Sequence, residues 1–191
     1  MIYYLSIILA VIIIVLCFLY SIVILDSVVT NISGTKYIDV SSSRKATRKI
    51  RDILERLDLK KEAVFFDLGS GRGAFSIRIK KIFPGFNVYG FDRSPFKICL
   101  SRIRAFFSGQ KIIFTRKNIF NVDLSKADIV YVYTWQTTMN QLKEKFEKEL
   151  RPGAIVVTST FTIPGWEPMI AEETLKIKRD PAFEKIYVYK R

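Results

Sequence analysis

The residues best suited to chemistry in this sequence are two aspartates and three alternating glycines. Asp67 is followed by Gly69, Gly71 and Gly73, and Asp92 comes later in the chain. Glycine lets a ligand approach bare backbone, and a carboxylate accepts hydrogen bonds from hydroxyl or ammonium groups. These residue types therefore predict a binding site for a small polar ligand.

The neighbouring residues predict the elements that position this site. The apolar run over residues 63–66 indicates a buried strand that ends at Asp67, and residues 74–79 carry apolar side chains at helical spacing. A glycine turn that opens a helix presents unpaired backbone N–H groups to a ligand. We therefore expect the ligand at the carboxyl end of this strand.

Two kinds of nucleotide cofactor fit the glycine turn. Gly69 and Gly71 begin a G-x-G-x-x-G/A dinucleotide fingerprint, and Asp92 ends the next expected strand, where a ribose-binding acid belongs. Together with Asp67 and Gly73, the same glycines match the D/E-x-G-x-G-x-G loop of S-adenosylmethionine (SAM) enzymes. A glycine turn that binds no ligand is the third interpretation.

Charge separates these interpretations. A pyrophosphate is anionic, and Asp67 at the mouth of the loop would repel it. SAM carries an ammonium and a sulfonium, which a carboxylate attracts. Arg72 would suit a phosphate, so the dinucleotide stays open, but the pattern favours SAM.

Further strand ends supply the other candidate site residues. Asp92 is suited to accept hydrogen bonds from both ribose hydroxyls, and the Asn118 amide can bond an adenine edge. Tyr133, Thr134 and Trp135 end a later strand, where aromatic rings can line an acceptor pocket or pack in the core. The predicted cofactor-binding residues are Asp67, Gly69, Ser70, Gly71, Gly73, Asp92, Arg93 and Asn118.

Strands and helices alternate over most of the chain. The expected strands cover residues 87–92, 111–117, 128–134, 154–157 and 185–189, and the expected helices cover residues 73–83, 139–150 and a stretch after Ser94. A basic amphipathic helix is expected after the serines at 41–43. Such alternation predicts an α/β fold with a doubly wound, mainly parallel sheet, and Pro164 and Pro168 before the last strand favour an antiparallel hairpin at its edge.

The N-terminal segment is long and apolar. Residues 2–25 contain no charged side chain, and this length is enough to cross a bilayer core as a helix. A cleaved signal peptide is the alternative, but no basic residue precedes the segment and no A-x-A site follows it. All Lys and Arg come after it, so the sequence predicts a single-pass membrane protein with its C-terminal domain in the cytoplasm.

Composition limits the partners and the chemistry. The chain has 31 Lys and Arg against 18 Asp and Glu, and no histidine. The basic excess favours an anionic lipid surface as partner over nucleic acid, with a generic basic face as the alternative. The absence of histidine excludes an imidazole base or ligand, and neither a metal site nor a catalytic residue is predicted.

The order of elements, the Asp67 loop, Asp92 and Asn118 resemble a class I, seven-stranded, Rossmann-like SAM-dependent methyltransferase. The apolar N-terminus, Tyr37-Ile38 and Trp166-Glu167-Pro168 are similar to the lysine methyltransferases that modify the ATP synthase c-ring protein and the adenine nucleotide translocase, with their prokaryotic relatives. The resemblance implies SAM as cofactor. The chain is expected to have three parts: a transmembrane anchor over residues 1–26, a juxtamembrane connector over 27–40 and a methyltransferase domain over 41–191.

The resulting hypothesis is a membrane-anchored enzyme that methylates a lysine of a membrane or membrane-proximal protein. The alternatives are a methyltransferase for a lipid, quinone or other small molecule, and a non-catalytic SAM-binding scaffold at the membrane. RNA base methylation is disfavoured, because residues 134–137 replace the Asn/Asp-Pro-Pro-aromatic motif of such enzymes.

Overall fold

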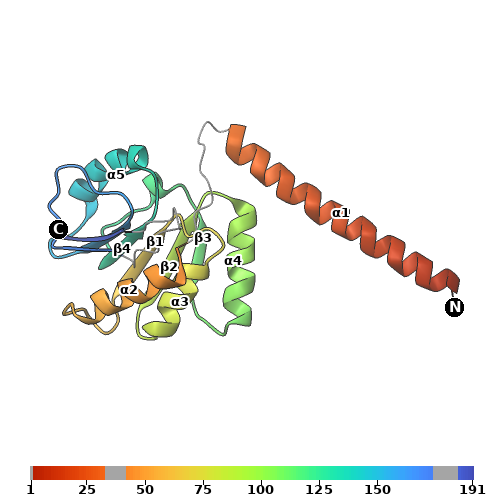
Figure 1. Ribbon diagram of the computed structural model, residues 1–191, viewed down its shortest axis with the longest axis horizontal. Coiled ribbons are helices and arrows are strands. Elements are labelled where there is room, and N and C mark those ends of the chain that lie inside the picture. The colour runs from red at the N-terminus through yellow and green to blue at the C-terminus, as the bar shows by residue number, and fades with distance from the viewer. Residues whose placement is uncertain (1, 33–41, 174–184) are drawn as a thin grey trace. The chain divides into compact units, whose positions relative to one another are not determined.

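The structure, a computed structural model, describes residues 2–32, 42–173 and 185–191 of the chain (Figure 1). Its contacts divide the chain into two units, Met1–Ile38 and Asp39–Arg191. The first unit contains the helix α1 (Ile2–Ile32), and the second contains a seven-stranded sheet with its helices.

Helix α1 has the composition of a membrane span. Its segment Tyr3–Ser21 has a mean hydropathy of 2.7 and is long enough to cross a bilayer, a property that signal sequences share. The hydroxyls of Ser6 and Ser21 donate to the carbonyls of Tyr3 and Cys17 in the same helix, which satisfies them without water. The helix runs past Asp26, so residues 27–32, predicted as connector, are helical, and residues 33–40 lie outside the described part.

The sheet confirms the predicted fold class. Its strands are β1 (Val64–Leu68), β2 (Asn87–Asp92), β3 (Ile113–Arg116), β4 (Ile129–Val132), β5 (Ile155–Ser159), β6 (Ile170–Glu173) and β7 (Lys185–Lys190). They lie in the order β3-β2-β1-β4-β5-β7-β6. Strands β1 to β5 are parallel, whereas β7 pairs antiparallel with both β5 and β6.

Helices cover both faces of this sheet (Figure 1). The helices α2 (Arg44–Glu55) and α3 (Ala74–Ile82) pack on one face, and α5 (Gln136–Glu149) packs on the other. Helix α4 (Pro95–Phe107) contacts β2, β3 and α3. Ser43 and Ser94 cap α2 and α4 through side-chain oxygens, as the sequence predicts.

Two boundaries near the site differ from the sequence-based expectation, and one strand was not predicted. β4 ends at Val132, so Tyr133 and Trp135 lie beyond the strand, and α5 begins at Gln136 instead of residue 139. Strand β6 is not predicted by its own residues, because its sequence Ile-Ala-Glu-Glu lacks a strand pattern. Its pairing with β7 stabilises it instead, as do ion pairs from Glu172 to Lys49 of α2 and to Arg56, which caps the C-terminus of that helix.

Phe114 of β3 packs beneath the glycines that form the site. A Cβ atom added at Gly90 would lie 2.5 Å from Phe114 ring atoms and 2.9 Å from Ser70 Oγ, and one added at Gly73 would lie 2.7 Å from the same ring. The close contact between β2, β3 and the loop after β1 therefore requires glycine at both positions.

We expect Gly90→Ala to destabilise the protein by about 1–3 kcal/mol, because the new methyl group overlaps the Phe114 ring. Urea unfolding of the full chain in detergent measures this. The double variant Gly90→Ala/Phe114→Leu should recover part of the loss, and equal stability of Gly90→Ala and wild type would contradict the packing described.

Candidate cofactor-binding site

Asp67 is the most deeply buried charged group of the site. Residues 65 and 67 of β1 face α3, and Ser76 Oγ of α3 donates a hydrogen bond to the Asp67 carboxylate, which is only 3% exposed. Burial raises the pKa of Asp67 to about 7, and the nearby Asp92 adds to this, while Ser76 and Arg78 oppose it. Asp67 therefore lies beneath the loop and not at its mouth, which corrects the sequence-based expectation.

The glycine loop uses its N–H groups to hold itself against β2. Gly69 N and Ser70 N both donate to Phe91 O, at 2.8 and 2.9 Å. Gly71 N donates to Asp92 Oδ2 at 3.0 Å, and Gly73 N donates to Ser70 O at 2.9 Å. The expectation of unpaired N–H groups is wrong for these four residues.

This pairing bears on the choice of ligand. A phosphate at a glycine turn is bound mainly by backbone N–H groups that point outward. The N–H groups of Gly69, Ser70, Gly71 and Gly73 are already committed within the protein. These four N–H groups are therefore not available to a pyrophosphate, which weakens the case for a dinucleotide at this loop independently of charge.

Two features of the loop fit a ligand that is not a phosphate. Gly69 has φ +83°, and a Cβ atom built on it would meet nothing within 4 Å, so open space lies over this backbone. Ser70 Oγ is buried and has no hydrogen-bond partner among the described residues. Open space over Gly69 and an unsatisfied hydroxyl on the next residue suit a small ligand with polar groups, such as the amino-acid part of SAM.

Asp92 is held in a fixed orientation at the end of β2. Its Oδ2 accepts from Gly71 N at 3.0 Å, and its Oδ1 accepts from Ser94 N at 2.8 Å. A carboxylate accepts about four hydrogen bonds, so an acid at this position is of a type suited to the paired hydroxyls of a ribose. The structure thus places Asp92 next to the glycine loop, as the predicted role requires.

Arg93 and Asn118 lie at the same edge of the sheet. Arg93 directly follows Asp92, and its carbonyl accepts from Arg116 Nε at 3.3 Å. Asn118 begins the 3-10 helix η1 (Ile119–Asn121), where its Oδ1 accepts from Phe120 N at 3.1 Å. This cap fixes the Asn118 side chain and leaves its NH₂ group as the part suited to an adenine edge.

The three predicted acceptor residues have different environments. Tyr133 is half-buried and packs against the core beneath α2, and Thr134 is half-buried. Trp135 is 37% exposed, and its ring centroid lies 6.0 Å from that of Phe161. Trp135 and Phe161 follow the ends of β4 and β5, so this aromatic pair lies at the sheet edge that carries the site.

Thr160 is a candidate residue that the sequence does not reveal. It adopts φ 72°, a left-handed conformation that is rare for a β-branched residue, and its Oγ1 is buried with no partner among the described residues. Such strain is concentrated at functional sites. Its position between Ser159 and Phe161 places it at the end of β5, and only its backbone dihedral, which sequence does not show, identifies it.

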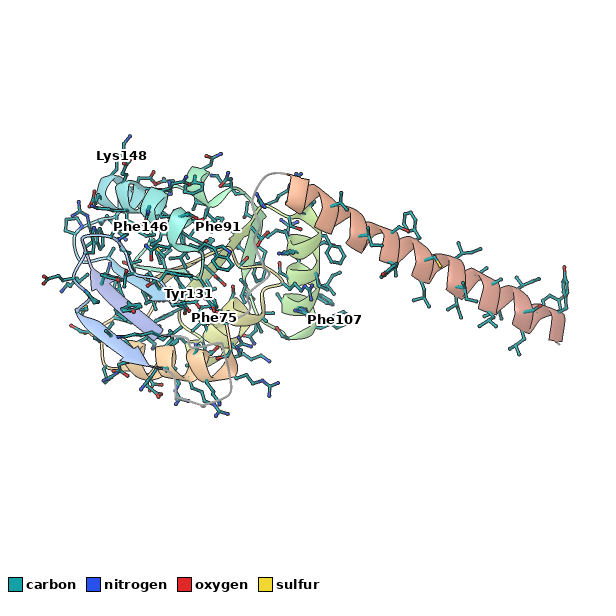
Figure 2. All side chains as sticks on the ribbon, turned by 45° about the horizontal axis from the view of Figure 1, so that its top comes forward. Phe75, Phe91, Phe107, Tyr131, Phe146 and Lys148 are labelled. Atoms are coloured by element: carbon teal, nitrogen blue, oxygen red, sulfur yellow. The ribbon has the colours of Figure 1, made fainter. Side chains whose placement is uncertain are left out.

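A buried hydroxyl network lies under the site, and sequence analysis did not predict it. Tyr131 Oη is 2.6 Å from Ser42 Oγ and 2.9 Å from Ser159 Oγ, and the centroid of the Tyr131 ring lies 4.0 Å from that of Phe75 (Figure 2). Arg78 donates to Ser42 O at 2.6 Å. Tyr131 of β4 is the register partner of Asp67 in β1. The network therefore holds Ser42, at the start of the domain, next to the strand that carries Asp67.

Comparison with known proteins identifies the family. Residues 67–170, more than half of the chain, match the ANTKMT methyltransferase domain. The chain belongs to this family.

Named relatives are similar across most of the domain. A protein-lysine N-methyltransferase of Saccharolobus islandicus is 30% identical over 142 residues, covering 73% of this chain and 86% of that protein. The adenine nucleotide translocase lysine N-methyltransferase of Mus musculus is 29% identical over 106 residues, covering 54% of this chain. The chain spans only 45% of the mouse protein.

Solved structures show the same fold. An RNA methyltransferase of Salinibacter ruber, in complex with S-adenosyl-L-homocysteine, superposes with a TM-score of 0.68 at 24% identity, covering 79% of this chain and 93% of that one. TrmN of Thermus thermophilus has a TM-score of 0.60 at 17% identity, covering 76% and 48%. Together with the family match, these results make the protein a SAM-dependent methyltransferase.

Substitution of Asp67 should separate stability from binding. A group with a raised pKa stabilises the fold below its unfolded value near pH 4 and loses this contribution as pH rises through about 7. We therefore expect Asp67→Asn to be more stable than wild type at pH 8, by on the order of 2 kcal/mol, and no more stable at pH 4. The same variant should bind SAM roughly tenfold or more weakly.

Urea unfolding at the two pH values and calorimetric titration with SAM measure both effects. Ser76→Ala serves as a control, because it removes the hydrogen bond and keeps the carboxylate. An Asp67→Asn variant that binds SAM as wild type does would contradict a role for this charge in binding.

Substitution of Thr160 should also have opposite effects on stability and activity. Thr160→Gly removes the left-handed strain, so we expect a gain of about 1 kcal/mol in stability. It also removes a hydroxyl from the sheet edge that carries Trp135 and Phe161, so methyl transfer should fall about tenfold while SAM affinity is unchanged. Thr160→Asn, which tolerates this conformation and stays polar, is the matched control; unchanged turnover in Thr160→Gly would exclude the residue from the acceptor site.

Proposed function

We propose that this protein is a membrane-anchored protein-lysine N-methyltransferase that modifies a membrane or membrane-proximal protein. The similarity to the Saccharolobus islandicus protein-lysine N-methyltransferase, which extends over 86% of that protein, carries the proposal of a lysine acceptor. The apolar segment Tyr3–Ser21 supports the anchor, and the basic residues that follow it support a cytoplasmic domain.

Binding of the cofactor would rest on the residues around the glycine loop. SAM supplies a methyl group on a positively charged sulfur. Asp67 and the Ser70 hydroxyl would hold its amino-acid part over Gly69, Asp92 would accept the ribose hydroxyls, and Asn118 would contact the adenine. Gly71 and Gly73 would shape the loop, and Arg93 would border it.

The acceptor side would be formed at the ends of β4 and β5. Trp135 and Phe161 present aromatic faces that attract an ammonium or a methylated ammonium, and Tyr133 and Thr134 adjoin them. A lysine has a reference pKa of about 10.4 and must lose its proton before it attacks a methyl group. Burial next to a second cation lowers the lysine pKa, so alignment and exclusion of water are the main tasks of this site.

Labelled SAM distinguishes this proposal from its alternatives. Membranes containing the wild-type chain should transfer the labelled methyl group to protein, and hydrolysis should release it as methyl-lysine. Asp92→Ala, with its membrane association intact, should lower SAM affinity roughly ten- to hundredfold and abolish this label. Label recovered in the organic extract would show a lipid or quinone acceptor instead, and absence of any transfer would favour the non-catalytic scaffold.

A further inference from the structure

The outward face of α4 is apolar where a surface helix is normally polar. The buried residues of this helix are Ile98, Ser101 and Ala105. On the opposite side, Phe106 and Phe107 are 80% and 81% exposed and their rings are in contact. The helix thus buries a serine and an alanine and exposes its two largest C-terminal side chains, which is unusual for an amphipathic helix.

These side chains form a continuous stripe. Cys99, Ile103, Phe106 and Phe107 are all exposed, and their spacing places them within an arc of about 100° on the helix surface. We call these four residues the α4 stripe. A continuous apolar stripe on a folded domain indicates an interaction surface.

Positive charge surrounds the α4 stripe. Residues 93–122 contain no Asp or Glu, and their basic residues are Arg93, Lys97, Arg102, Arg104, Lys111, Arg116 and Lys117. Arg102 and Arg104 flank the stripe on either side of the helix. Their guanidinium groups donate to the carbonyls of Phe114 and Arg72, so hydrogen bonding fixes them without cancelling their charge.

We propose that the α4 stripe docks on an anionic membrane surface, with Phe106 and Phe107 in the headgroup region and Arg102 and Arg104 against lipid phosphates. Exposed aromatic and aliphatic residues within a basic border are the combination that binds such surfaces. A second copy of this chain fits less well, because it would bring two acid-free basic segments together. Nucleic acid fits less well, because the side chains of Cys99 and Ile103 are poorly suited to hydrogen-bond bases or phosphates.

This proposal rests on the proposed membrane location and specifies how the domain lies there. Helix α4 begins at Pro95, and Ser94 N bonds the Asp92 carboxylate, so one end of α4 borders the cofactor site. The helix is about 20 Å long, with the phenylalanine pair at its far end. Docking along α4 would therefore hold the cofactor site close to the membrane surface, within reach of a lysine near the bilayer.

Site-specific fluorescence quenching tests the docking. The full chain, with Cys17→Ser and Cys99→Ala, carries either Phe107→Cys or Lys148→Cys labelled with an environment-sensitive fluorophore. Figure 2 shows Phe107 on α4 and Lys148 on α5 at opposite sides of the domain, which makes Lys148 a matched control. Each protein is reconstituted into phosphatidylcholine vesicles with or without about 30% phosphatidylserine, and headgroup-attached nitroxide lipids serve as quencher.

The proposal predicts quenching at position 107 that exceeds quenching at 148 by a factor of about three or more in anionic vesicles. The difference should shrink in phosphatidylcholine alone and at high salt, because screening weakens attraction to the surface. With the label at Ile103→Cys, the added changes Phe106→Asp and Phe107→Asp should remove the quenching. Unchanged SAM affinity of that variant would show that its fold is intact.

Other outcomes overturn the proposal. Equal quenching at 107 and 148 in a chain that floats with the vesicles would reject the docking surface and leave the membrane location standing. A chain that does not float would reject both. A response at position 107 to an RNA oligonucleotide but not to lipid would assign the surface to nucleic acid, and a response to protein concentration alone would assign it to a second copy.

Discussion

A buried carboxylate beneath a closed glycine loop is the feature on which the rest of the site depends. Asp67 and Asp92 lie near the ends of adjacent parallel strands, and the charge of Asp92 adds to the cost of ionising Asp67. Burial raises the pKa of Asp67 to about 7, so its charge is poorly stabilised by the protein alone. A cationic ligand over Gly69 would supply the missing stabilisation, whereas an anionic one would add a third negative charge. The preference for SAM over a diphosphate therefore follows from solvation and charge as well as from family membership.

The surrounding fold holds these two acids in place through contacts between distant segments. Phe91 O binds two N–H groups of the loop, and the Asp92 carboxylate binds a third, so the loop and the end of β2 form one rigid unit. Tyr131 connects Ser42 and Ser159 beneath that unit. Such preorganisation reduces the entropy lost when a ligand binds. It also means that the segment leading into α2 is coupled to the cofactor site through buried hydroxyl groups.

Local patterns in the sequence predicted the sheet class, the glycine turn, the position of Asp92 at the end of β2 and the caps of α2 and α4, because each depends on neighbouring residues. They did not predict that the loop N–H groups bond to Phe91, nor the Ser42–Tyr131 contact, which joins residues far apart in the chain. Asp67 was expected at the mouth of the loop, but strand alternation turns it towards Ser76 of α3. Thr160 is recognisable only from its dihedral angle, and β6 only from its partners. Long-range contacts and backbone strain are thus what the sequence left undetermined.

The ionisation of Asp67 can be observed directly and decides whether the buried acid selects a cationic ligand. The carboxyl ¹³C resonance of Asp67 can be followed through a pH titration of the full chain in detergent, without ligand, with S-adenosylhomocysteine and with SAM. We expect the pKa of Asp67 to be about 7 in the free protein. With SAM this pKa should be lower by about one unit or more, and the shift should be smaller with S-adenosylhomocysteine, which lacks the charged sulfur. A midpoint close to the ordinary value of a carboxyl in the free protein, or one that does not move when SAM binds, would contradict this role of Asp67.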